Sequence, residues 1–301
     1  MKTYIYILIL ILLPLYAYSV DSNDPDLWRG ERRFIPTKSL AMAGAQNIGA
    51  NRTDAAYLNP ATLITKDKKY MMSFDAQYTN SNVPTQFMIS AVDSRTSSVA
   101  GGAYVGYYNY NVEDGNKTVN YNALQIGLSY AYPIMGGLVL GIGGRYYKYK
   151  KDDENYLHSV TFDLGMTYRF SPYIKIGVVG YNLANLDYIE TPMSIVSGIS
   201  VGDDEMFLIN FDFVADFSAP KIYDKSGNAT YEYHTGIQVT PTDGFSILAG
   251  YEINKVLDEN FWSLGTEIFV PESRVELTTA YLQSTSKESN KYFSFSLRLY
   301  F

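Results

Sequence analysis

The most regular feature of the chain is an alternation of apolar with polar or small residues, which recurs in runs from Tyr70 to the last residue. Because successive side chains of a β-strand point to opposite faces, each run predicts a strand with one apolar and one polar face. The clearest run is the last, in which Ser294, Ser296, Arg298 and Tyr300 separate Phe293, Phe295, Leu297, Leu299 and Phe301. We expect strands over Tyr70–Tyr78, Gln86–Val92, Val99–Tyr108, Leu124–Tyr132, Leu138–Tyr146, Val160–Phe170, Tyr173–Asn182, Met193–Val201, Met206–Val214, Tyr231–Val239, Phe245–Ile253, Trp262–Val270, Val275–Tyr281 and Phe293–Phe301.

Alternation alone fits both a membrane barrel and a soluble sandwich. The lengths of the connectors between the strands distinguish these two folds. Tight turns such as Ser171-Pro172 and Pro271-Glu272-Ser273 alternate with longer polar connectors. Outer-membrane barrels have short periplasmic turns and longer external loops, and an even number of strands of about ten residues each. The sequence therefore predicts an all-β fold, a transmembrane antiparallel β-barrel of about 14 strands. The expected external connectors are Asn111–Asn120, Lys150–Tyr156, Ser218–Ala229, Asn254–Asn260 and Ser284–Asn290.

The polar faces of the expected strands carry charged residues, whereas their apolar faces carry hardly any. A charge that faces lipid at mid-membrane costs about 2–4 kcal/mol for Arg or Lys, so the polar faces are expected to line the lumen. There the charges are expected to form an ion-pair network. The expected lumenal charges are Arg145, Asp163, Arg169, Asp212, Glu252, Glu267, Glu276 and Arg298.

Residues 1–19 have the pattern of a signal peptide. Lys2 precedes an apolar core over Tyr4–Leu13, Pro14 ends that core, and Ala17-Tyr18-Ser19 offers small residues to a signal peptidase. We expect cleavage after Ser19, with an uncleaved anchor as the alternative. The net charge of −7 argues against nucleic-acid binding, and the absence of Cys excludes disulfides and thiol chemistry.

Residues 20–69 lack the alternation and contain the small-residue stretch Ala41–Ala45, then Asp54-Ala55-Ala56 and Asn59-Pro60-Ala61. This combination resembles the N-terminal hatch of FadL-type proteins, outer-membrane transporters of long-chain fatty acids and other hydrophobic compounds, including their PorV/PorQ-like branch. The resemblance implies a fourteen-stranded barrel over residues 70–301 whose lumen is plugged by residues 20–69, with Asn59, Pro60 and Ala61 as the hatch motif. The residues by themselves also fit an ordinary capped turn before the first strand.

The third expected strand contains Gly101, Gly102 and Gly106. Glycine within a strand marks a bulge, a kink or a close approach of another backbone. In FadL-type proteins a kink in the third strand opens the wall sideways, so the resemblance implies a kink at these glycines. The alternative is that they only make room for a plug.

Two functions remain open at this point. The first is passive uptake of hydrophobic small molecules past the hatch and sideways into the membrane, which needs no cofactor. The second is a structural or secretion-associated barrel that holds a protein partner, which the short external loops and the plugged lumen favour.

No arrangement of residues points to catalysis or to a metal. The sequence Gly198-Ile199-Ser200-Val201-Gly202 matches a nucleophile-elbow pattern, but a turn and another strand follow it where that motif requires a helix. His158 and His234 stand alone, without metal-ligand spacing around either. We therefore expect neither an enzyme nor a cofactor.

Phe301 occupies the position of the aromatic C-terminal signal that the outer-membrane assembly machinery reads. Together with the signal peptide, it predicts a protein in the outer membrane of a Gram-negative-type bacterium, with membrane lipid and that machinery as partners. Deleting Phe301 should impair insertion.

Overall fold

A computed structural model describes residues 35–64, 70–79, 85–114, 117–151, 154–184, 193–217, 229–255, 258–286 and 291–301. The predicted signal peptide and nearly all of the predicted connector Ser218–Ala229 lie outside the described residues.

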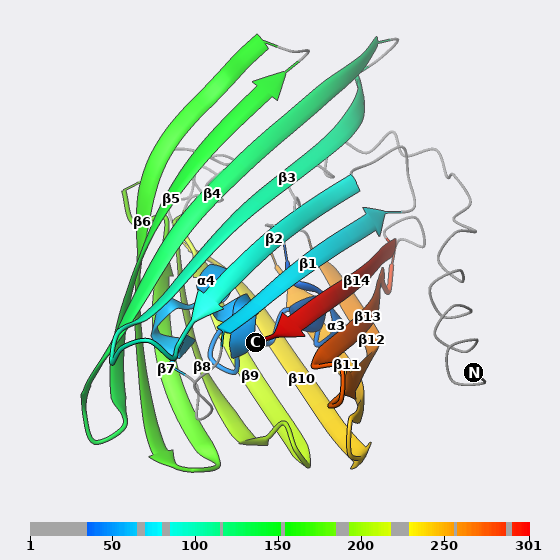
Figure 1. Ribbon diagram of the computed structural model, residues 1–301. Coiled ribbons are helices and arrows are strands. Elements are labelled where there is room, and N and C mark those ends of the chain that lie inside the picture. The colour runs from blue at the N-terminus through cyan, green and yellow to red at the C-terminus, as the bar shows by residue number, and fades with distance from the viewer. Residues whose placement is uncertain are drawn as a thin grey trace.

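Fourteen antiparallel strands form one closed barrel, in which β1 pairs with both β2 and β14 (Figure 1). Closure leaves no strand edge unpaired, as a β-structure within a bilayer requires. The predicted fold class and number of strands are therefore confirmed. The strands are β1 Tyr70–Thr79, β2 Thr85–Asp93, β3 Ala100–Asp114, β4 Lys117–Met135, β5 Leu138–Lys151, β6 Glu154–Ser171, β7 Ile174–Tyr181, β8 Ser194–Asp203, β9 Phe207–Asp216, β10 Thr230–Thr242, β11 Phe245–Asn254, β12 Glu259–Val270, β13 Val275–Ser284 and β14 Lys291–Tyr300.

The burial of the two strand faces is the reverse of that in a soluble protein. In β6 the apolar Val160 and Phe162 are 73% and 41% exposed, while the intervening Thr161 and the following Asp163 are 2% and 1% exposed. The same inversion runs around the barrel, where large apolar side chains are exposed while Asp75, Arg145, Asp212, Glu276 and Arg298 are at most 3% exposed. A continuous apolar outer surface of this extent is stable against lipid rather than water. The barrel is therefore a transmembrane one.

Tight turns lie at one rim of the barrel, the rim that also carries Tyr70 and Phe301. The β4–β5, β6–β7 and β10–β11 turns contain only residues 136–137, 172–173 and 243–244 between their strands. Because outer-membrane barrels have their short turns on the periplasmic side, we call this the periplasmic rim.

Strands β3 to β6 continue well beyond the lengths that the sequence predicts. The predicted connectors Asn111–Asn120 and Lys150–Tyr156 are wrong, because β3 pairs with β4 as far as Asp114 and Lys117, and β5 with β6 as far as Lys151 and Glu154. Backbone pairing needs no apolar face, so a polar hairpin can rise above the bilayer. Between β3 and β4, Asn109 donates to the Asn122 side-chain oxygen at 2.7 Å, a cross-strand bond of this kind. Figure 1 shows these strands rising beyond the others.

Residues 35–64, called the inner segment from here on, lie inside the barrel (Figure 1). They form short helices joined by turns, and almost every residue is buried. No helix in the described part of the chain is long and apolar enough to cross a membrane. The elements of the inner segment are α3 Thr37–Ala41, η2 Arg52–Asp54, α4 Ala55–Leu58 and η3 Pro60–Thr62, where η denotes a 3₁₀ helix.

Two apolar clusters join the inner segment to the wall. One packs α4 and Leu63 against Met71, Met88 and Tyr104 on β1 to β3. The other packs α3 against Leu248, Phe261 and Leu282 on β11 to β13. Polar contacts fill the space between these clusters, and they define the site described next.

Candidate functional site

The Asn59-Pro60-Ala61 motif forms a turn inside the lumen. The Asn59 side-chain oxygen accepts a hydrogen bond from the Ala61 backbone amide at 3.0 Å, and the Thr62 hydroxyl donates to the Asn59 carbonyl at 2.8 Å. Asn59 thus caps η3, and Pro60 is the first residue of this helix. Proline has no amide hydrogen, but the first amide of a helix has no acceptor within the helix, so none is lost. The sequence motif is therefore a capped turn, as its residues indicate, but one enclosed by the barrel.

Glycines of the wall make room for this turn. A Cβ atom at Gly141 would overlap the backbone of Pro60 and Ala61, and one at Gly165 would overlap the Asn59 side chain. Other glycines of the wall contact other parts of the inner segment in the same way. The inner segment therefore lies closer to the strands than a residue larger than glycine at these wall positions would allow. These further pairs are Gly102 with Ala56 and Leu63, Gly236 and Gly250 with Met42, and Gly265 with Ala41.

A buried cluster of charges joins Arg298 of β14 to the inner segment. Arg298 forms an ion pair with Glu276 and a second with Asp54 at 2.8 Å, and its Nε donates to the Thr53 hydroxyl at 2.8 Å. Burial raises the pKa of the Asp54 carboxyl above its ordinary value, and the Arg298 charge offsets part of that rise. All of the guanidinium nitrogens of Arg298 therefore have an acceptor, as a buried cation requires.

Arg52 extends the same cluster toward the periplasmic rim. Its guanidinium pairs with Glu276, with Glu267 at 3.1 Å and with Asp204 at 3.0 Å. Burial would lower the pKa of Arg52, but the carboxylates, led by that of Glu276, outweigh it and hold the pKa above its ordinary value. Burial would likewise raise the pKa of Asp204, but Arg52 outweighs it and holds that pKa well below its usual range. The fully buried Lys38 lies 3.1 Å from Glu267 and completes the network.

Two carboxylates and an arginine of the wall also bind backbone groups of the inner segment. Asp75 accepts from the Thr37 amide at 3.1 Å, and Asp212 accepts from the Asn47 amide at 2.7 Å. On β5, Arg145 pairs with Asp163 of β6 and donates to the Tyr57 carbonyl at 2.6 Å. The segment is thus bound to strands all around the barrel.

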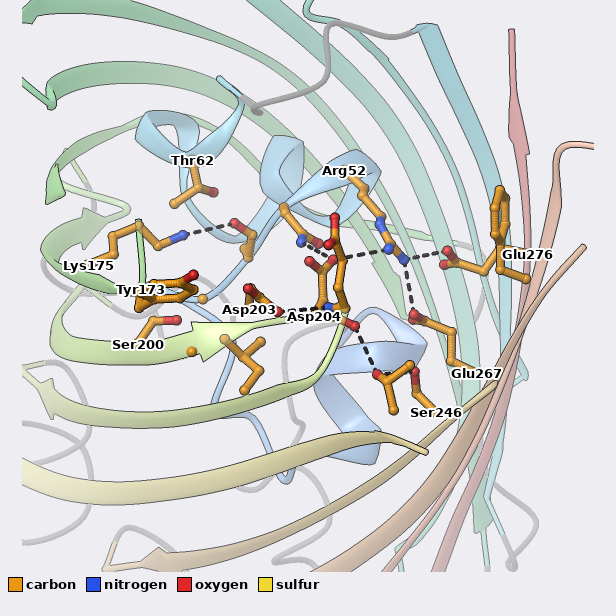
Figure 2. Close-up of a pocket in the computed structure, with 18 of the residues that line it drawn as sticks. Arg52, Thr62, Tyr173, Lys175, Ser200, Asp203, Asp204, Ser246, Glu267 and Glu276 are labelled. Carbon is orange, nitrogen blue, oxygen red and sulfur yellow. Dashed lines mark hydrogen bonds and ion pairs between the residues drawn. The ribbon is translucent and has the colours of Figure 1, made fainter. Parts of the chain in front are cut away.

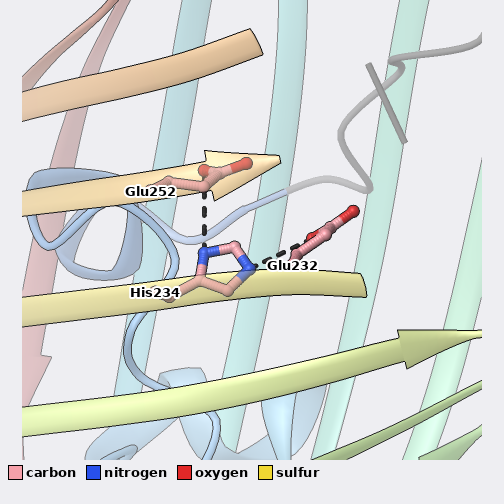
Figure 3. A group of neighbouring side chains, drawn as sticks. All are labelled: Glu232, His234 and Glu252. Atoms are coloured by element: carbon pink, nitrogen blue, oxygen red, sulfur yellow. Dashed lines mark hydrogen bonds and ion pairs between the residues drawn. The ribbon is translucent and has the colours of Figure 1, made fainter. Parts of the chain in front are cut away.

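Glu232, His234 and Glu252 form the group that most resembles a metal site, with one ligand atom of each within 4.8 Å of the others. Figure 3 shows each carboxylate beside a different ring nitrogen, with Glu232 at 3.0 Å from Nε2 and Glu252 at 3.6 Å from Nδ1. Nδ1 also lies 2.7 Å from the Ala43 carbonyl, which only accepts, so Nδ1 carries a proton. A metal needs an unprotonated ring nitrogen, and Nε2 faces away from Glu252. The geometry therefore suits an imidazolium between two carboxylates better than a metal ion.

A cavity of about 490 Å³ lies between the inner segment and the periplasmic rim (Figure 2). One side carries the acidic residues Glu267, Glu276 and Asp204 with Arg52 among them, and the other carries Lys175 and Arg169. Figure 2 shows Lys175 on the far side of the cavity from Arg52. Ile64, Met71 and Leu208 also line the cavity, so its surface is partly apolar as well as charged.

The wall beside the glycines of β3 is continuously paired. The registers of β2 with β3 and of β3 with β4 pass Gly101, Gly102 and Gly106 without a shift. Gly102 faces the inner segment, where Ala56 and Leu63 occupy the space a side chain would need. A Cβ at Gly101 or Gly106 would meet only atoms 3.7 Å or more away. Close packing thus accounts for Gly102, and the predicted kink stays a prediction.

The structure places all of the predicted lumenal charges on the inner face of the barrel. Only some of them pair with one another, and others bind residues of the inner segment. Arg145 pairs with Asp163, and Arg298 with Glu276, across neighbouring strands. Glu267 pairs with cations of the inner segment, Asp212 binds an amide of that segment, and Arg169 forms no ion pair within the described residues. The inner-segment residues that complete the network, which sequence reasoning missed, are Lys38, Asn47, Arg52, Thr53 and Asp54. Lys38, Arg52 and Asp54 have one signal in the sequence, a charge within a stretch of small residues, and Asp54 also belongs to the Asp54-Ala55-Ala56 motif. Asn47 and Thr53 have no such signal.

Solved structures with a similar fold exist, although comparison of the sequence alone finds no relative. No protein-family model and no curated protein sequence matches the chain. The toluene transporter TbuX of Ralstonia pickettii superposes with a TM-score of 0.65 at 12% identity, over 88% of this chain and 97% of that one. A FadL homologue of Pseudomonas aeruginosa superposes with a TM-score of 0.63 at 11% identity, over 88% and 98%. The chain has the FadL-type barrel fold.

A third solved structure of this shape is the monoaromatic hydrocarbon channel CymD, with a TM-score of 0.61 at 15% identity, over 88% of this chain and 96% of that one. At these identities the likeness concerns the fold. It confirms the resemblance suggested by Asn59-Pro60-Ala61 at the level of the barrel, and it leaves the roles of individual residues to be argued from this chain's own contacts.

Proposed function

We propose that the protein is an outer-membrane channel for the passive uptake of hydrophobic small molecules. In this proposal residues 20–69 act as a hatch, a solute enters from the external side, and it leaves sideways through the wall near β3 into the membrane. The FadL-type fold supports the general role, since proteins of that fold are described as channels and transporters of toluene and monoaromatic hydrocarbons. No energy source or cofactor is required.

The observation that carries the proposal is a sector of wall in β1 to β3 whose outer face is apolar and whose inner face carries an apolar cluster. Inside the barrel, Met71, Met88, Val92 and Tyr104 pack against the inner segment. Buried polar side chains also lie on this inner face, namely Ser73, Asp75, Gln77, Gln86 and Ser90. Outside, Ile89 and Val105 on the same strands are 54% and 46% exposed toward lipid. No ion pair among the described side chains involves β2 or β3, so an apolar solute that crossed between these two strands would break none of them. A crossing between β12 and β14 would break ion pairs of Glu267, Glu276 or Arg298.

Passage requires movement, because the wall is closed and the inner segment fills the lumen. The part that has to move in the proposal is α4 and η3, which lie beside β2 to β6. The Gly102–Ala56 contact is where this part touches β3, with the Gly102 Cβ position 2.7 Å from the Ala56 Cβ.

A disulfide between the inner segment and β3 tests this route. The protein has no Cys, so Ala56→Cys with Gly102→Cys supplies the single pair. Cysteine Cβ atoms are about 3.5–4.5 Å apart in a disulfide, so a shift of about 1 Å accommodates the bond. Cells carrying the oxidised variant should take up a labelled fatty acid or a labelled aromatic hydrocarbon no faster than cells without the protein. Reduction should restore uptake.

The matched control locks the other end of the inner segment. Met42→Cys with Gly236→Cys joins the end of α3 to β10, where the Gly236 Cβ position lies 2.7 Å from the Met42 Cβ, as at the Gly102–Ala56 contact. Uptake should survive this bond, since α3 is not expected to move. Equal uptake by cells with and without the natural protein would contradict the whole proposal, and normal uptake through the 56–102 disulfide would contradict the route.

The alternative, a structural or secretion-associated barrel that holds a protein partner, is favoured by one observation. The inner segment is hydrogen-bonded to strands all around the lumen, as a permanent seal would be. Crosslinking followed by pull-down from native membranes tests it. Recovery of the barrel alone would count against this alternative.

A further inference from the structure

Three neighbouring strands place hydrogen-bond donors side by side on the inner wall near the periplasmic rim. Arg169 of β6 is the direct cross-strand partner of Lys175 of β7, and Lys175 is the direct partner of Ser200 of β8. Adjacent strands lie about 4.8 Å apart, so a guanidinium, an ammonium and a hydroxyl stand in one row. All three residues line the 490 Å³ cavity.

The two cations of this row differ from the other cations of the lumen. Lys38, Arg52, Arg145 and Arg298 each pair with at least one carboxylate. Among the described residues, neither Arg169 nor Lys175 forms an ion pair. Within the described part of the chain, the Lys175 ammonium donates one hydrogen bond, to the Ala50 carbonyl oxygen at 3.5 Å, the long limit for such a bond (Figure 2).

The nearby carboxylates are engaged elsewhere. Asp204 accepts from Asn51 at 2.9 Å and pairs with Arg52, and Asp203 accepts from backbone amides of its own turn. Glu205 and Asp243 also line the cavity, but they are exposed to solvent. Like charges placed directly opposite each other across two strands destabilise the pair. The row therefore carries a repulsion that an anion in the cavity would relieve.

We propose that Arg169, Lys175 and Ser200 form a binding site for an oxyanion at the periplasmic mouth of the lumen. The ligand class is a carboxylate or phosphate group, which accepts from a planar guanidinium in two places and from the ammonium and hydroxyl beside it. Ile64 and Leu208 line the same cavity and would contact an apolar portion attached to the anion. The anion-binding proposal can be tested separately from the uptake proposal, because anion binding is measured on the purified protein and uptake is measured in cells.

Titration calorimetry of the purified full-length protein with inorganic phosphate and with butyrate tests the site, with butanol as the uncharged probe. Natural protein should bind at least one of the two anions and not butanol. Arg169→Gln and Lys175→Gln should each weaken binding about tenfold or more, because each removes a charged hydrogen bond. The matched control is Arg274→Gln, which removes an exposed cation from the same rim and should leave binding unchanged.

Thermal unfolding without the anion separates a binding role from a structural one. Lys175→Gln should unfold at the same temperature as the natural protein or higher, since it removes the repulsion with Arg169. Binding of phosphate alone assigns the site to phosphate groups, and binding of butyrate alone assigns it to carboxylates. The proposal is overturned if neither anion binds, if Arg169→Gln and Lys175→Gln bind as the natural protein does, or if Arg274→Gln weakens binding equally.

Discussion

Both halves of the inner segment pack apolar residues against the wall, but they differ in the charges that hold them. Residues 35–54 add buried ion pairs to the packing of α3, with Lys38 and Arg52 on Glu267 and with Asp54 on Arg298. Residues 55–64 are held mostly by apolar packing and by neutral donors, such as the Ser129 hydroxyl on the Ala56 carbonyl at 2.7 Å. The exception is Arg145, which donates to the Tyr57 carbonyl.

This difference indicates which half can move. Separating a buried ion pair leaves both charges without partners in a low dielectric, which is costly. Separating apolar and neutral contacts costs less if a solute or water replaces them. The first half is therefore the fixed anchor of the inner segment, and the second half, beside the apolar sector of β1 to β3, is the part that a passing solute would displace.

The largest test of this comparison removes the central cation of the anchor. Arg298→Met should destabilise the barrel by about 3–5 kcal/mol, because Asp54 loses its buried partner and Glu276 loses one of two. Urea unfolding in lipid vesicles measures the change. Lys255→Met, at an exposed cation, should shift stability by less than about 0.5 kcal/mol. Equal effects of the two substitutions would show that the ion pairs do not anchor the segment.

A smaller effect is expected where the second half touches the wall. Gly141→Ala places a methyl group onto the Pro60–Ala61 backbone and should cost about 1–3 kcal/mol. Gly144→Ala, on the same strand but facing outward with nothing within 4 Å, should be neutral or slightly stabilising. The same unfolding experiment compares them. If both are neutral, the second half yields to the methyl group and is held more loosely than its packing indicates.

The smallest effect concerns the link between Arg52 and the β8–β9 turn. Since the pKa of Asp204 is held well below its usual range, its ion pair contributes stability above the unfolded carboxyl pKa of about 3.9 and loses it only as pH falls through the lower folded pKa. Asp204→Asn should cost about 1 kcal/mol or less, because both side chains are partly exposed. The deficit should be constant from about pH 8 to pH 5 and shrink below about pH 4. A deficit that grows on acidification would contradict the assignment.

Much of the barrel could be predicted from the sequence because its signals are local. Alternation with a period of two identifies the strands and the face of each side chain, as at Val160 to Asp163, without reference to any distant residue. The wrong predictions lie where pairing with another strand, rather than the local residue pattern, determines the structure. At Asn111–Asn120 and Lys150–Tyr156 the polar residues predict connectors, but pairing with the neighbouring strand extends the hairpins.

By itself, the sequence determined the strands, the charged inner face, the short turns of the periplasmic rim and the capped turn at Asn59. Only the tertiary structure decided that Lys38, Arg52 and Asp54 complete the lumenal ion pairs, that Gly141 and Gly165 make room for Pro60 and Ala61, and that Arg169 and Lys175 face a cavity without a counter-ion. The physical reason is separation along the chain. These contacts join residues about 80 to 245 positions apart, as Thr53 and Arg298 are, and no periodicity in either segment records which side chains meet when the barrel closes around its own N-terminal part.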